Sequence, residues 1–265
     1  MELITSRTNP RIKHARALRQ RKARQETGLF LIEGIRPVGE ALEASVPVEA
    51  IYFAPDLLES PYARQLIESQ AIRGVPCFAT SAEVFETLAD KENPQGILAV
   101  ARQKSYSLAD LSPGNFPWGV ALVSPQDPGN VGTILRTIDA VGASGLLLLD
   151  TSVDPYHPAS VRASMGALFW CPVVSAVFDD FAAWVQRHGY HIYGTSAHAE
   201  RDYRHVSAFP RPLILLMGSE RAGLTLEQAA VCQELIRLPM HGRSTSLNLA
   251  VAAGVLLYAI EAAQA

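Results

Sequence analysis

Cysteine is scarce in this 265-residue chain, and its three cysteines, Cys77, Cys171 and Cys232, lie far apart with no C-x-x-C pair. An odd number of isolated cysteines argues against a disulfide framework and favours a reducing compartment. Long hydrophobic runs are also missing, since the longest apolar stretch, 249–260, is too short to span a bilayer. The N-terminus is polar and basic, without the apolar segment of a secretory signal. These absences predict a cytoplasmic protein with no membrane partner.

The common signatures of nucleotide, hydrolase and metal sites are absent as well. There is no G-x-G-x-x-G fingerprint, no G-x-x-x-x-G-K-[ST] phosphate loop and no G-x-S-x-G nucleophile turn. The seven histidines form no H-E-x-x-H pair, and His188 and His191 have no cysteine or carboxylate pair beside them. The sequence therefore predicts neither a standard nucleotide-binding loop nor a metal site.

The net charge is small, because 23 basic and 26 acidic residues give −3, which by itself argues against a nucleic-acid-binding tail. The charge is unevenly distributed, however. Residues 1–24 hold eight basic residues and the single acid Glu2, a net charge of +7, so the remaining 241 residues carry −10. Such a basic segment fits either a solvated helix face or a surface that contacts phosphates. It contains no aromatic residue, so base stacking is not indicated.

The first third of the chain has the pattern of a small α/β unit, and Asn9-Pro10 signals entry into its first helix. Before Trp118 the periodicity is lost and Ser, Pro and Gly accumulate, which predicts domains at 1–102 and 119–265 joined by a linker at 103–118. In the first domain we expect helices at 12–25, 37–44, 62–69 and 82–89, and strands at 29–32, 50–53, 75–78 and 96–101.

From Gly119 onwards, expected strands and helices alternate. Near-continuous apolar strands such as 146–149 and 213–217 are typical of a parallel sheet covered on both faces, so we expect an α/β domain with a mostly parallel, doubly wound sheet. Strands are expected at 120–124, 145–149, 173–174, 191–195, 213–217 and 235–238, and helices at 131–141, 178–187, 226–231 and 246–262.

Three of these strands end in unusual loops, and ligands of such sheets bind beyond the carboxyl ends of the strands. The first loop spans 124–133 and leads into a helix that carries Arg136, the second spans 218–223, and the third spans 239–246. Each combines glycine, which permits close backbone approach, with polar side chains at a strand end or a helix N-terminus. Together the loops predict one ligand site.

The same loops resemble the three ordered motifs of the SpoU/TrmH family of SPOUT RNA methyltransferases. The matching runs are DPGNVGTILRT at 127–137, MGSE at 217–220, and LPM followed by SLNLAVA within 238–252. The run RASMGA at 162–167 also resembles that family, and FLIEG at 30–34 is typical of its L30e-like substrate-binding domain. Several motifs in the right order make the resemblance specific, and it extends over nearly the whole chain.

The resemblance implies an enzyme that transfers the methyl group of S-adenosylmethionine to a ribose 2′-hydroxyl of structured RNA. It implies an L30e-like α/β domain followed by a SPOUT domain with a C-terminal trefoil knot, which generic topology rules would not suggest. It also implies a homodimer formed through the C-terminal domain. A separate N-terminal domain favours ribosomal RNA over transfer RNA, again by resemblance only.

Matched position by position, the resemblance places the cofactor against the backbone of Gly218, Leu238 and Leu247, with Met217 and Met240 as apolar walls. An adenine ring needs such an apolar slot with a few backbone partners. Methionines are, however, also common in plain hydrophobic cores.

Five residues match the family's reaction centre: the catalytic arginine Arg136, the first-motif Asn130, the second-motif acid Glu220, and the third-motif pair Ser246 and Asn248. Because a guanidinium stays protonated, we expect Arg136 to hold an RNA phosphate and to lower the proton affinity of the hydroxyl, rather than to act as a base. A phosphate oxygen or water would then accept the proton, while the two amides and the serine orient the ribose, Arg136 and the carboxylate of the cofactor. Glu220 would fix either Arg136 or a ribose hydroxyl.

Plainer interpretations exist for these residues. Asn130 and Ser246 are also residue types that cap helices. Arg136 would make an ordinary surface pair with Asp139, and Glu220 would make an ordinary loop acid. The three-motif context favours the functional interpretation in each case.

The basic segment lies on the domain that the resemblance assigns to RNA, so we expect it to contact phosphates through Arg7, Arg11, Lys13, Arg16, Arg19 and Lys22. Three alternatives stay open: a transfer-RNA 2′-O-methyltransferase, a methyltransferase acting on a base, and a non-catalytic RNA-binding or assembly factor on the same fold. The last would predict eroded cofactor motifs, whereas Arg136, Gly218, Ser246 and Asn248 are intact.

Overall fold

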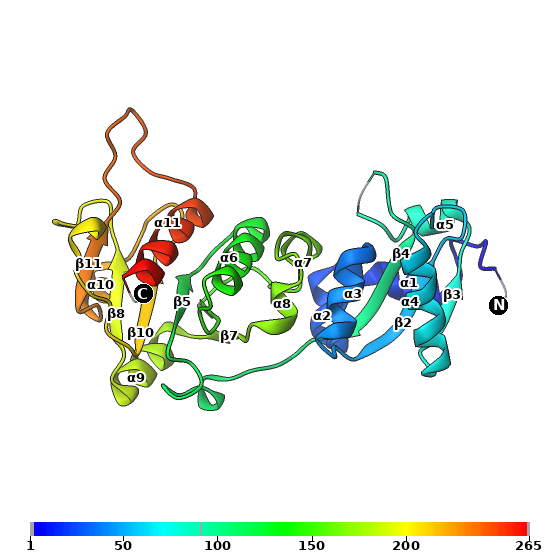
Figure 1. The fold of residues 1–265 in the computed structure, drawn as a ribbon, viewed down its shortest axis with the longest axis horizontal. Coiled ribbons are helices and arrows are strands. Elements are labelled where there is room, and N and C mark those ends of the chain that lie inside the picture. The colour runs from blue at the N-terminus through cyan, green and yellow to red at the C-terminus, as the bar shows by residue number, and fades with distance from the viewer. Residues whose placement is uncertain (1–2, 91, 264–265) are drawn as a thin grey trace. The chain divides into compact units, whose positions relative to one another are not determined.

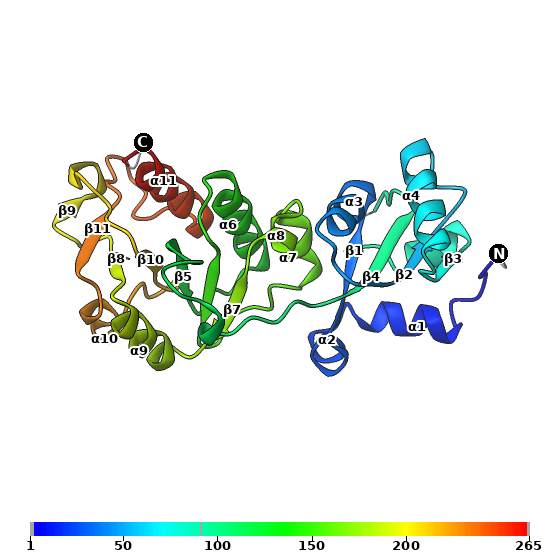
Figure 2. The same ribbon diagram turned by 60° about the horizontal axis from the view of Figure 1, so that its bottom comes forward.

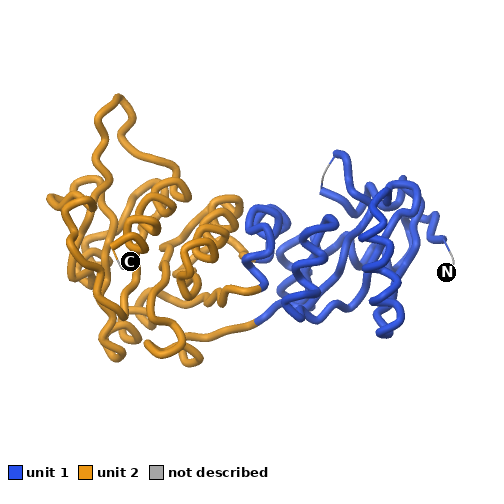
Figure 3. The backbone as a smooth tube through the Cα atoms, viewed as in Figure 1, with its two compact units in different colours: residues 1–104, 156–169 blue, residues 105–155, 170–265 orange. Residues whose placement is uncertain are grey.

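The computed structural model describes residues 3–90 and 92–263, which form two compact units (Figure 3). Unit 1 consists of the described residues up to Lys104 together with Tyr156–Phe169. Unit 2 consists of Ser105–Pro155 and the described residues from Trp170 onwards. Each unit has its own sheet and its own hydrophobic core. Among the described residues, no helix is long and apolar enough to cross a membrane.

Unit 1 is built on a four-stranded sheet with the order β1-β4-β2-β3 (Figures 1 and 2). β4 pairs antiparallel with β1 and β2, whereas β3 is parallel to β2. The strands are β1 (Leu29–Glu33), β2 (Val48–Phe53), β3 (Cys77–Ala79) and β4 (Ile97–Arg102). The helices are α1 (Pro10–Ala17), α2 (Arg21–Thr27), α3 (Ile35–Glu43), α4 (Pro61–Ile72), α5 (Ala82–Glu86) and α7 (Pro158–Ala163). The small α/β unit expected from the sequence is therefore present.

The single helix expected at 12–25 is wrong, because the chain breaks between α1 and α2. Leu18 turns into the core there and is fully buried. The guanidinium of Arg24 is buried beside the break, and its Nη1 donates to the carbonyl oxygens of Leu18 and Arg19, each at 2.9 Å. Carbonyls at the end of a helix lack partners within it, so Arg24 satisfies groups that the break exposes.

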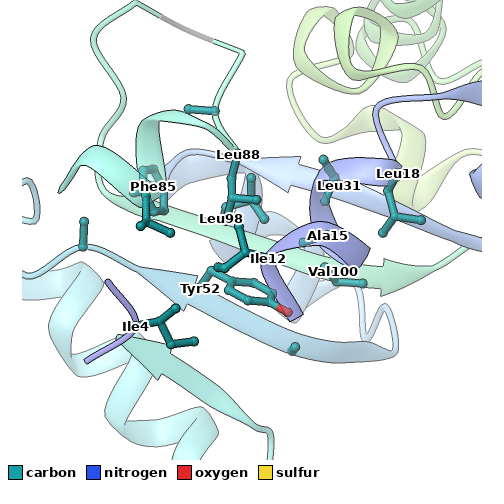
Figure 4. Close-up of a cluster of buried hydrophobic side chains, with 14 residues drawn as sticks. Ile4, Ile12, Ala15, Leu18, Leu31, Tyr52, Phe85, Leu88, Leu98 and Val100 are labelled. Carbon is teal, nitrogen blue, oxygen red and sulfur yellow. The ribbon is translucent and has the colours of Figure 1, made fainter. Parts of the chain in front are cut away.

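α1 is anchored to the sheet of unit 1 by its apolar side. Ile12 and Ala15 are fully buried against a cluster that includes Leu31 of β1 and Val100 of β4 (Figure 4). Burying an isoleucine side chain contributes about 1.5–3 kcal/mol. Lys13 and His14, which lie between these two anchors, are exposed on the side of α1 that faces away from the core.

Unit 2 contains a seven-stranded sheet with the order β7-β6-β5-β10-β8-β11-β9, in which every pairing is parallel. The strands are β5 (Trp118–Val123), β6 (Leu146–Leu149), β7 (Val173–Ala176), β8 (His191–Thr195), β9 (Arg201–Asp202), β10 (Leu213–Met217) and β11 (Glu234–Arg237). The helices are α6 (Pro128–Ala140), α9 (Phe178–His188), α10 (Leu226–Ala230) and α11 (Leu249–Ala262), while α8 (Ala167–Trp170) spans the boundary of the units. All residues of β6 and β10 are buried, so the α/β fold with a mostly parallel sheet is confirmed.

The segment at 103–118, predicted as a linker, is largely packed into unit 2. It contains a short 3-10 helix, η1 (Leu108–Asp110), and its Leu111 and Phe116 are buried in the core of that unit. Conversely, 156–169 belongs to unit 1, where the ring of Tyr156 lies 4.7 Å from that of Phe30. The run RASMGA, which follows the first motif in the sequence, thus lies in unit 1.

Candidate active site

Three loops leave the carboxyl ends of parallel strands in unit 2, as the sequence predicted. The loop after β5 leads into α6, the loop after β10 forms a tight turn, and the loop after β11 leads to α11 (Figure 1). β10 pairs in parallel with both β5 and β8, and β11 pairs in parallel with β8, so the three strands end at one edge of the sheet. This edge is where α/β sheets bind ligands.

One predicted site residue from each of the three motifs takes part in a continuous chain of hydrogen bonds. Nδ2 of Asn248 donates to Oδ1 of Asn130 (2.9 Å), and Nδ2 of Asn130 donates to Oε1 of Glu220 (3.1 Å). The other oxygen of Glu220 accepts from the backbone N–H of Gln126 (3.2 Å). We call this the Asn–Glu chain. It joins residues 90 and 118 positions apart, which only the tertiary fold brings together.

The helix-capping interpretation of Asn130 and Ser246 is wrong, because other residues cap α6 and α11. Asp127 is the N-cap of α6, and its Oδ1 accepts from backbone N–H groups of the first turn. Asn248 is the N-cap of α11 and accepts in the same way. Asn248 thus uses its oxygen for the helix and its NH2 group for Asn130, which fixes the orientation of its amide.

The turn that carries Glu220 depends on a glycine. Ser219 and Gly223 exchange two backbone hydrogen bonds, of 3.2 and 3.0 Å, and these close the turn. A Cβ at Gly218 would overlap the backbone of Gly223, so any larger residue would force the turn open. Gly218 therefore permits the close approach of two backbone segments that places Glu220 against the first loop.

Gln126 is a residue of this site that the sequence reasoning missed. Its Nε2 donates to the carbonyl oxygens of Ser124 (2.8 Å) and Thr151 (3.2 Å), which ties the loop after β5 to the loop after β6. Ser124 has a φ of 46°, a left-handed conformation that its surroundings must hold in place. Asp127-Pro128 marks the helix start in the sequence, but no sequence signal singles out Gln126.

Arg136 and Ser246 are not members of the Asn–Glu chain. Arg136 is exposed on α6, about 9 Å along the helix axis from Asn130. Within the described chain it makes no hydrogen bond and no ion pair, so neither the surface pair with Asp139 of the plainer interpretation nor a contact with Glu220 is formed. Ser246 is exposed and likewise makes no hydrogen bond with a described residue. Both side chains are available to a substrate.

The residues expected to hold the cofactor lie on the second and third loops or directly beside them in the sequence. Met217 is buried at the end of β10, Leu238 and Met240 are half-buried, and Leu247 is 42% exposed. Within residues 3–90 and 92–263, the backbone of 239–247 has no hydrogen-bond partner, so its N–H and C=O groups are open to an external one. Apolar side chains beside open backbone groups fit an adenine ring, and hence S-adenosylmethionine.

The described residues hold no group of three His, Cys, Asp or Glu side chains that could bind a metal ion. Burial raises the pKa of the Cys171 and Cys232 thiols to about 12, and the charge of Asp139 adds to the rise at Cys171. Burial also raises the pKa of Cys77. Thiols that stay protonated at neutral pH are poor nucleophiles, so these cysteines give no indication of covalent catalysis.

The basic residues expected to bind RNA differ in their contacts. Lys13 and Arg16 on α1 have no partner among the residues that the structure describes. Arg11 lies over the ring of Phe78, 4.7 Å from its centroid. Three others contact acids: Arg7 with Glu83 (3.9 Å), Arg19 with Asp90 (2.9 Å) and Lys22 with Glu26 (3.8 Å). Lys13 and Arg16 are therefore the most available for phosphate.

Two protein families match this sequence. The SpoU rRNA Methylase family matches residues 117–258, a span that contains all three loops, and the MRM3-like substrate binding domain matches residues 9–99. The chain belongs to the SpoU rRNA methylase family. The resemblance to the SpoU/TrmH family is thereby confirmed, with a substrate-binding domain ahead of the SpoU domain.

The similarity to SpoU-type enzymes extends over nearly the whole chain. The chain is 33% identical to a 23S rRNA (uridine(2479)-2′-O)-methyltransferase of Streptomyces viridochromogenes, over 96% of this chain and 90% of that protein. It is 30% identical to the 23S rRNA (guanosine(2553)-2′-O)-methyltransferase RlmP of Bacillus subtilis, over 97% of this chain and 98% of that protein. An AdoMet-bound rRNA methyltransferase from Sinorhizobium meliloti is 36% identical and superposes with a TM-score of 0.90, covering 98% of this chain and 97% of that one. This SpoU protein is thus a methyltransferase that uses S-adenosylmethionine.

Proposed function

We propose that this SpoU-family enzyme methylates a ribose 2′-hydroxyl of ribosomal RNA in the cytoplasm. The observation that carries the proposal is the Asn–Glu chain, which gathers one residue from each motif beside the helix that presents Arg136. The similar proteins named as 23S rRNA 2′-O-methyltransferases support ribosomal RNA over transfer RNA.

Arg136 supplies the positive charge for this reaction. Its guanidinium stays protonated, so it holds an RNA phosphate and stabilises the negative charge that develops on the attacking 2′-oxygen. The proton passes to a phosphate oxygen of the RNA or to water. The exposed and unpaired state of Arg136 in the described chain supports this role, because no protein acid competes for it.

The Asn–Glu chain positions the ribose. Within the Asn–Glu chain, Asn130 uses its oxygen for one hydrogen bond and its NH2 group for one. One N–H and one oxygen lone pair are therefore left for substrate. Glu220 fixes that amide rather than Arg136, and the hydroxyl of Ser246 supplies a further contact. Correct positioning of the two reacting groups accounts for much of the acceleration in such a transfer.

The backbone at Gly218, Leu238 and Leu247, with the side chains of Met217 and Met240, is proposed to hold the cofactor. When bound, S-adenosylmethionine supplies an electrophilic methyl group on a sulfonium leaving group. The open backbone groups of the third loop support this assignment. We also propose that the C-terminal region forms the trefoil knot that the family resemblance implies.

α11 supports the proposed homodimer. One side of this helix packs on α6. The other side exposes Val251, Val255 and Tyr258, at 52%, 38% and 55%, and their spacing places them on one face. A contiguous apolar face in water marks an interaction surface. Sedimentation of the wild type and of Val251→Asp tests this: we expect a dimer and a monomer, respectively, and a monomeric wild type would contradict it.

The function itself is tested by incubating the protein with labelled S-adenosylmethionine and ribosomal RNA from a strain that lacks it. We expect label at one ribose 2′-oxygen, located by mapping 2′-O-methyl groups, and none in transfer RNA treated in parallel. Label on a base, or no label in any RNA, would contradict the proposal. Neutralising Lys13 and Arg16 together is expected to weaken RNA binding and to reduce its salt dependence.

A further inference from the structure

Two arginines from distant parts of the sequence meet on one carboxylate in unit 1. Nη2 of Arg19 donates to Oδ1 of Asp90 (2.9 Å), and Nη1 of Arg162 donates to Oδ2 (2.6 Å). Arg19 lies between α1 and α2, Arg162 lies on α7, and Asp90 lies between α5 and β4. Two guanidiniums thus bracket the two oxygens of a single anion.

The surroundings of this cluster indicate what kind of anion it suits. A cavity of about 20 Å³ adjoins it, lined also by Leu31, Glu33 and Val161. This volume holds about one water molecule and excludes an organic ligand. The side chains of Arg19, Asp90 and Arg162 are 38%, 33% and 43% exposed. An anion therefore reaches the arginines from the protein surface.

We infer that Arg19 and Arg162 form a binding site for a backbone phosphate of the RNA substrate, and that the Asp90 carboxylate occupies this site in the free protein. The inference rests on the proposed function, because it requires RNA as the partner. A phosphate presents two oxygens to paired guanidiniums as a carboxylate does. Exposed ion pairs contribute little to stability, so the exchange of Asp90 for phosphate is not opposed by a strong interaction.

The position of the cluster supports an RNA ligand. Arg19 belongs to the basic segment, with Arg16 and Lys22 within three residues of it, so the site continues a surface already expected to contact phosphates. Glu33 accepts from the backbone N–H of Asp90 (2.8 Å) and stays in place when the Asp90 side chain withdraws. The two guanidiniums outweigh this single remaining carboxylate, so the exposed site is positive.

The inference also gives a role to the run RASMGA, which the reaction centre does not use. Arg162 is its first residue. Gly166 has a φ of 103°, and a Cβ there would lie 3.0 Å from Cβ of Glu40, so the glycine lets this segment approach α3 closely. The run thereby holds α7 against the rest of unit 1, with Arg162 bonded to Asp90.

The test is binding of the full-length protein to an unmodified in vitro transcript of 23S ribosomal RNA, measured at several salt concentrations. We expect Asp90→Asn to bind about fivefold more tightly than the wild type, because the arginines are no longer neutralised. Its dependence of affinity on salt should be steeper, since each additional phosphate contact raises the slope by about 0.7–0.9. Arg162→Gln and Arg19→Gln should bind about fivefold more weakly, with a shallower slope.

Two exposed residues of unit 1 without partners in the described chain provide matched controls. Glu68→Gln removes one negative charge and Arg73→Gln one positive charge, away from the cluster. If Asp90→Asn matches Glu68→Gln in affinity and slope, or binds more weakly than the wild type, the inference is overturned. Should Asp90→Asn fail to fold, Arg162→Gln is compared with its control Arg73→Gln instead. Equal RNA affinity and equal salt slope of these two variants would overturn the inference. Wild-type protein that binds no ribosomal RNA would instead refute the proposed function.

Discussion

The loops of unit 2 and the basic segment of unit 1 both stand out in the sequence, yet the fold uses them differently. In the loops, polar side chains bond to one another across the sheet edge and leave Arg136 unpaired within the described chain. In the basic segment, the protein itself engages several charges: Arg24 is buried and Arg19 is held by Asp90. An ordered set of motifs thus indicates which residues share a site, whereas a count of charges does not indicate which remain available.

The strongest test of this contrast is Arg136→Ala. An unpaired arginine has no structural partner to lose, so we expect folding and S-adenosylmethionine binding to be unchanged while kcat/KM falls at least about 100-fold. The measurements are methyl incorporation into ribosomal RNA and calorimetric binding of the cofactor. Arg187→Ala, at an exposed position on α9, is the matched control. Activity of Arg136→Ala within about threefold of the control would rule out the role of Arg136.

The opposite behaviour is expected of Arg24→Met. This change keeps the volume but removes the donor to two helix-end carbonyls, so the free energy of unfolding should fall by about 2 kcal/mol. Lys13→Met, on the open side of α1, should change it by less than about 0.5 kcal/mol. Urea unfolding measures both variants. Equal stability of the two variants would show that the buried Arg24 contributes no more to folding than the exposed Lys13.

The regular parts of the fold were the most predictable from sequence. β8 and β10 coincide with the expected strands at 191–195 and 213–217, because a buried parallel strand is an apolar run with polar ends. α7 was missed, since six residues are too few to show a helical period. The grouping of 156–169 with unit 1 rests on contacts such as that between Phe30 and Tyr156, for which no local pattern exists.

The site was predictable as a set of residues but not as a set of bonds. Motif order identified Asn130, Glu220 and Asn248, yet their partners lie about a hundred positions away, so the pairings emerged only from the fold. Asp127 and Asn248 are the helix caps, although Asn130 and Ser246 are also capping residue types. Capping depends on where the helix begins, and boundaries are the part of a helix that sequence patterns define least well.

Asn248 allows a smaller and sharper test, since it serves both helix and site. Asn248→Ala removes both contacts and should lower the free energy of unfolding by about 1 kcal/mol. Asn248→Asp keeps an oxygen for the cap and loses only the donor to Asn130, so its stability should stay near that of the wild type. Both variants should lose methyl transfer. Full activity of Asn248→Asp would mean that the bond to Asn130 does not matter for the reaction.

The smallest expected effect concerns pH and the pairing of Asp90. The hydrogen bond from Arg162 lowers the pKa of Asp90; burial partly opposes this, and the charges of Arg162 and Arg19 add to it. A lowered pKa in the folded state stabilises the protein above the ordinary aspartate value of about 3.9, and this stabilisation is lost as the pH falls through the lowered pKa. Because Asp90 is partly exposed, we expect less than about 1 kcal/mol.

Urea unfolding of the wild type and Asp90→Asn between pH 2 and pH 7 measures this effect. The difference in free energy of unfolding should be constant above about pH 5 and shrink in acid. A difference that does not change with pH would show that the ion pairs with Arg19 and Arg162 do not stabilise unit 1.

The N-cap of α11 couples the start of this helix to the reaction centre. The amide hydrogens of Ala250 and Val251 are bonded to Oδ1 of Asn248, at N···O distances of 2.9 and 3.3 Å, while its NH2 group is bonded to Asn130. The amide group is planar and rigid, so a rotation that breaks one set of bonds disturbs the other. Hydrogen–deuterium exchange at these two apolar residues therefore reports whether the hydrogen bonds of Asn248, including the one to Asn130, are intact.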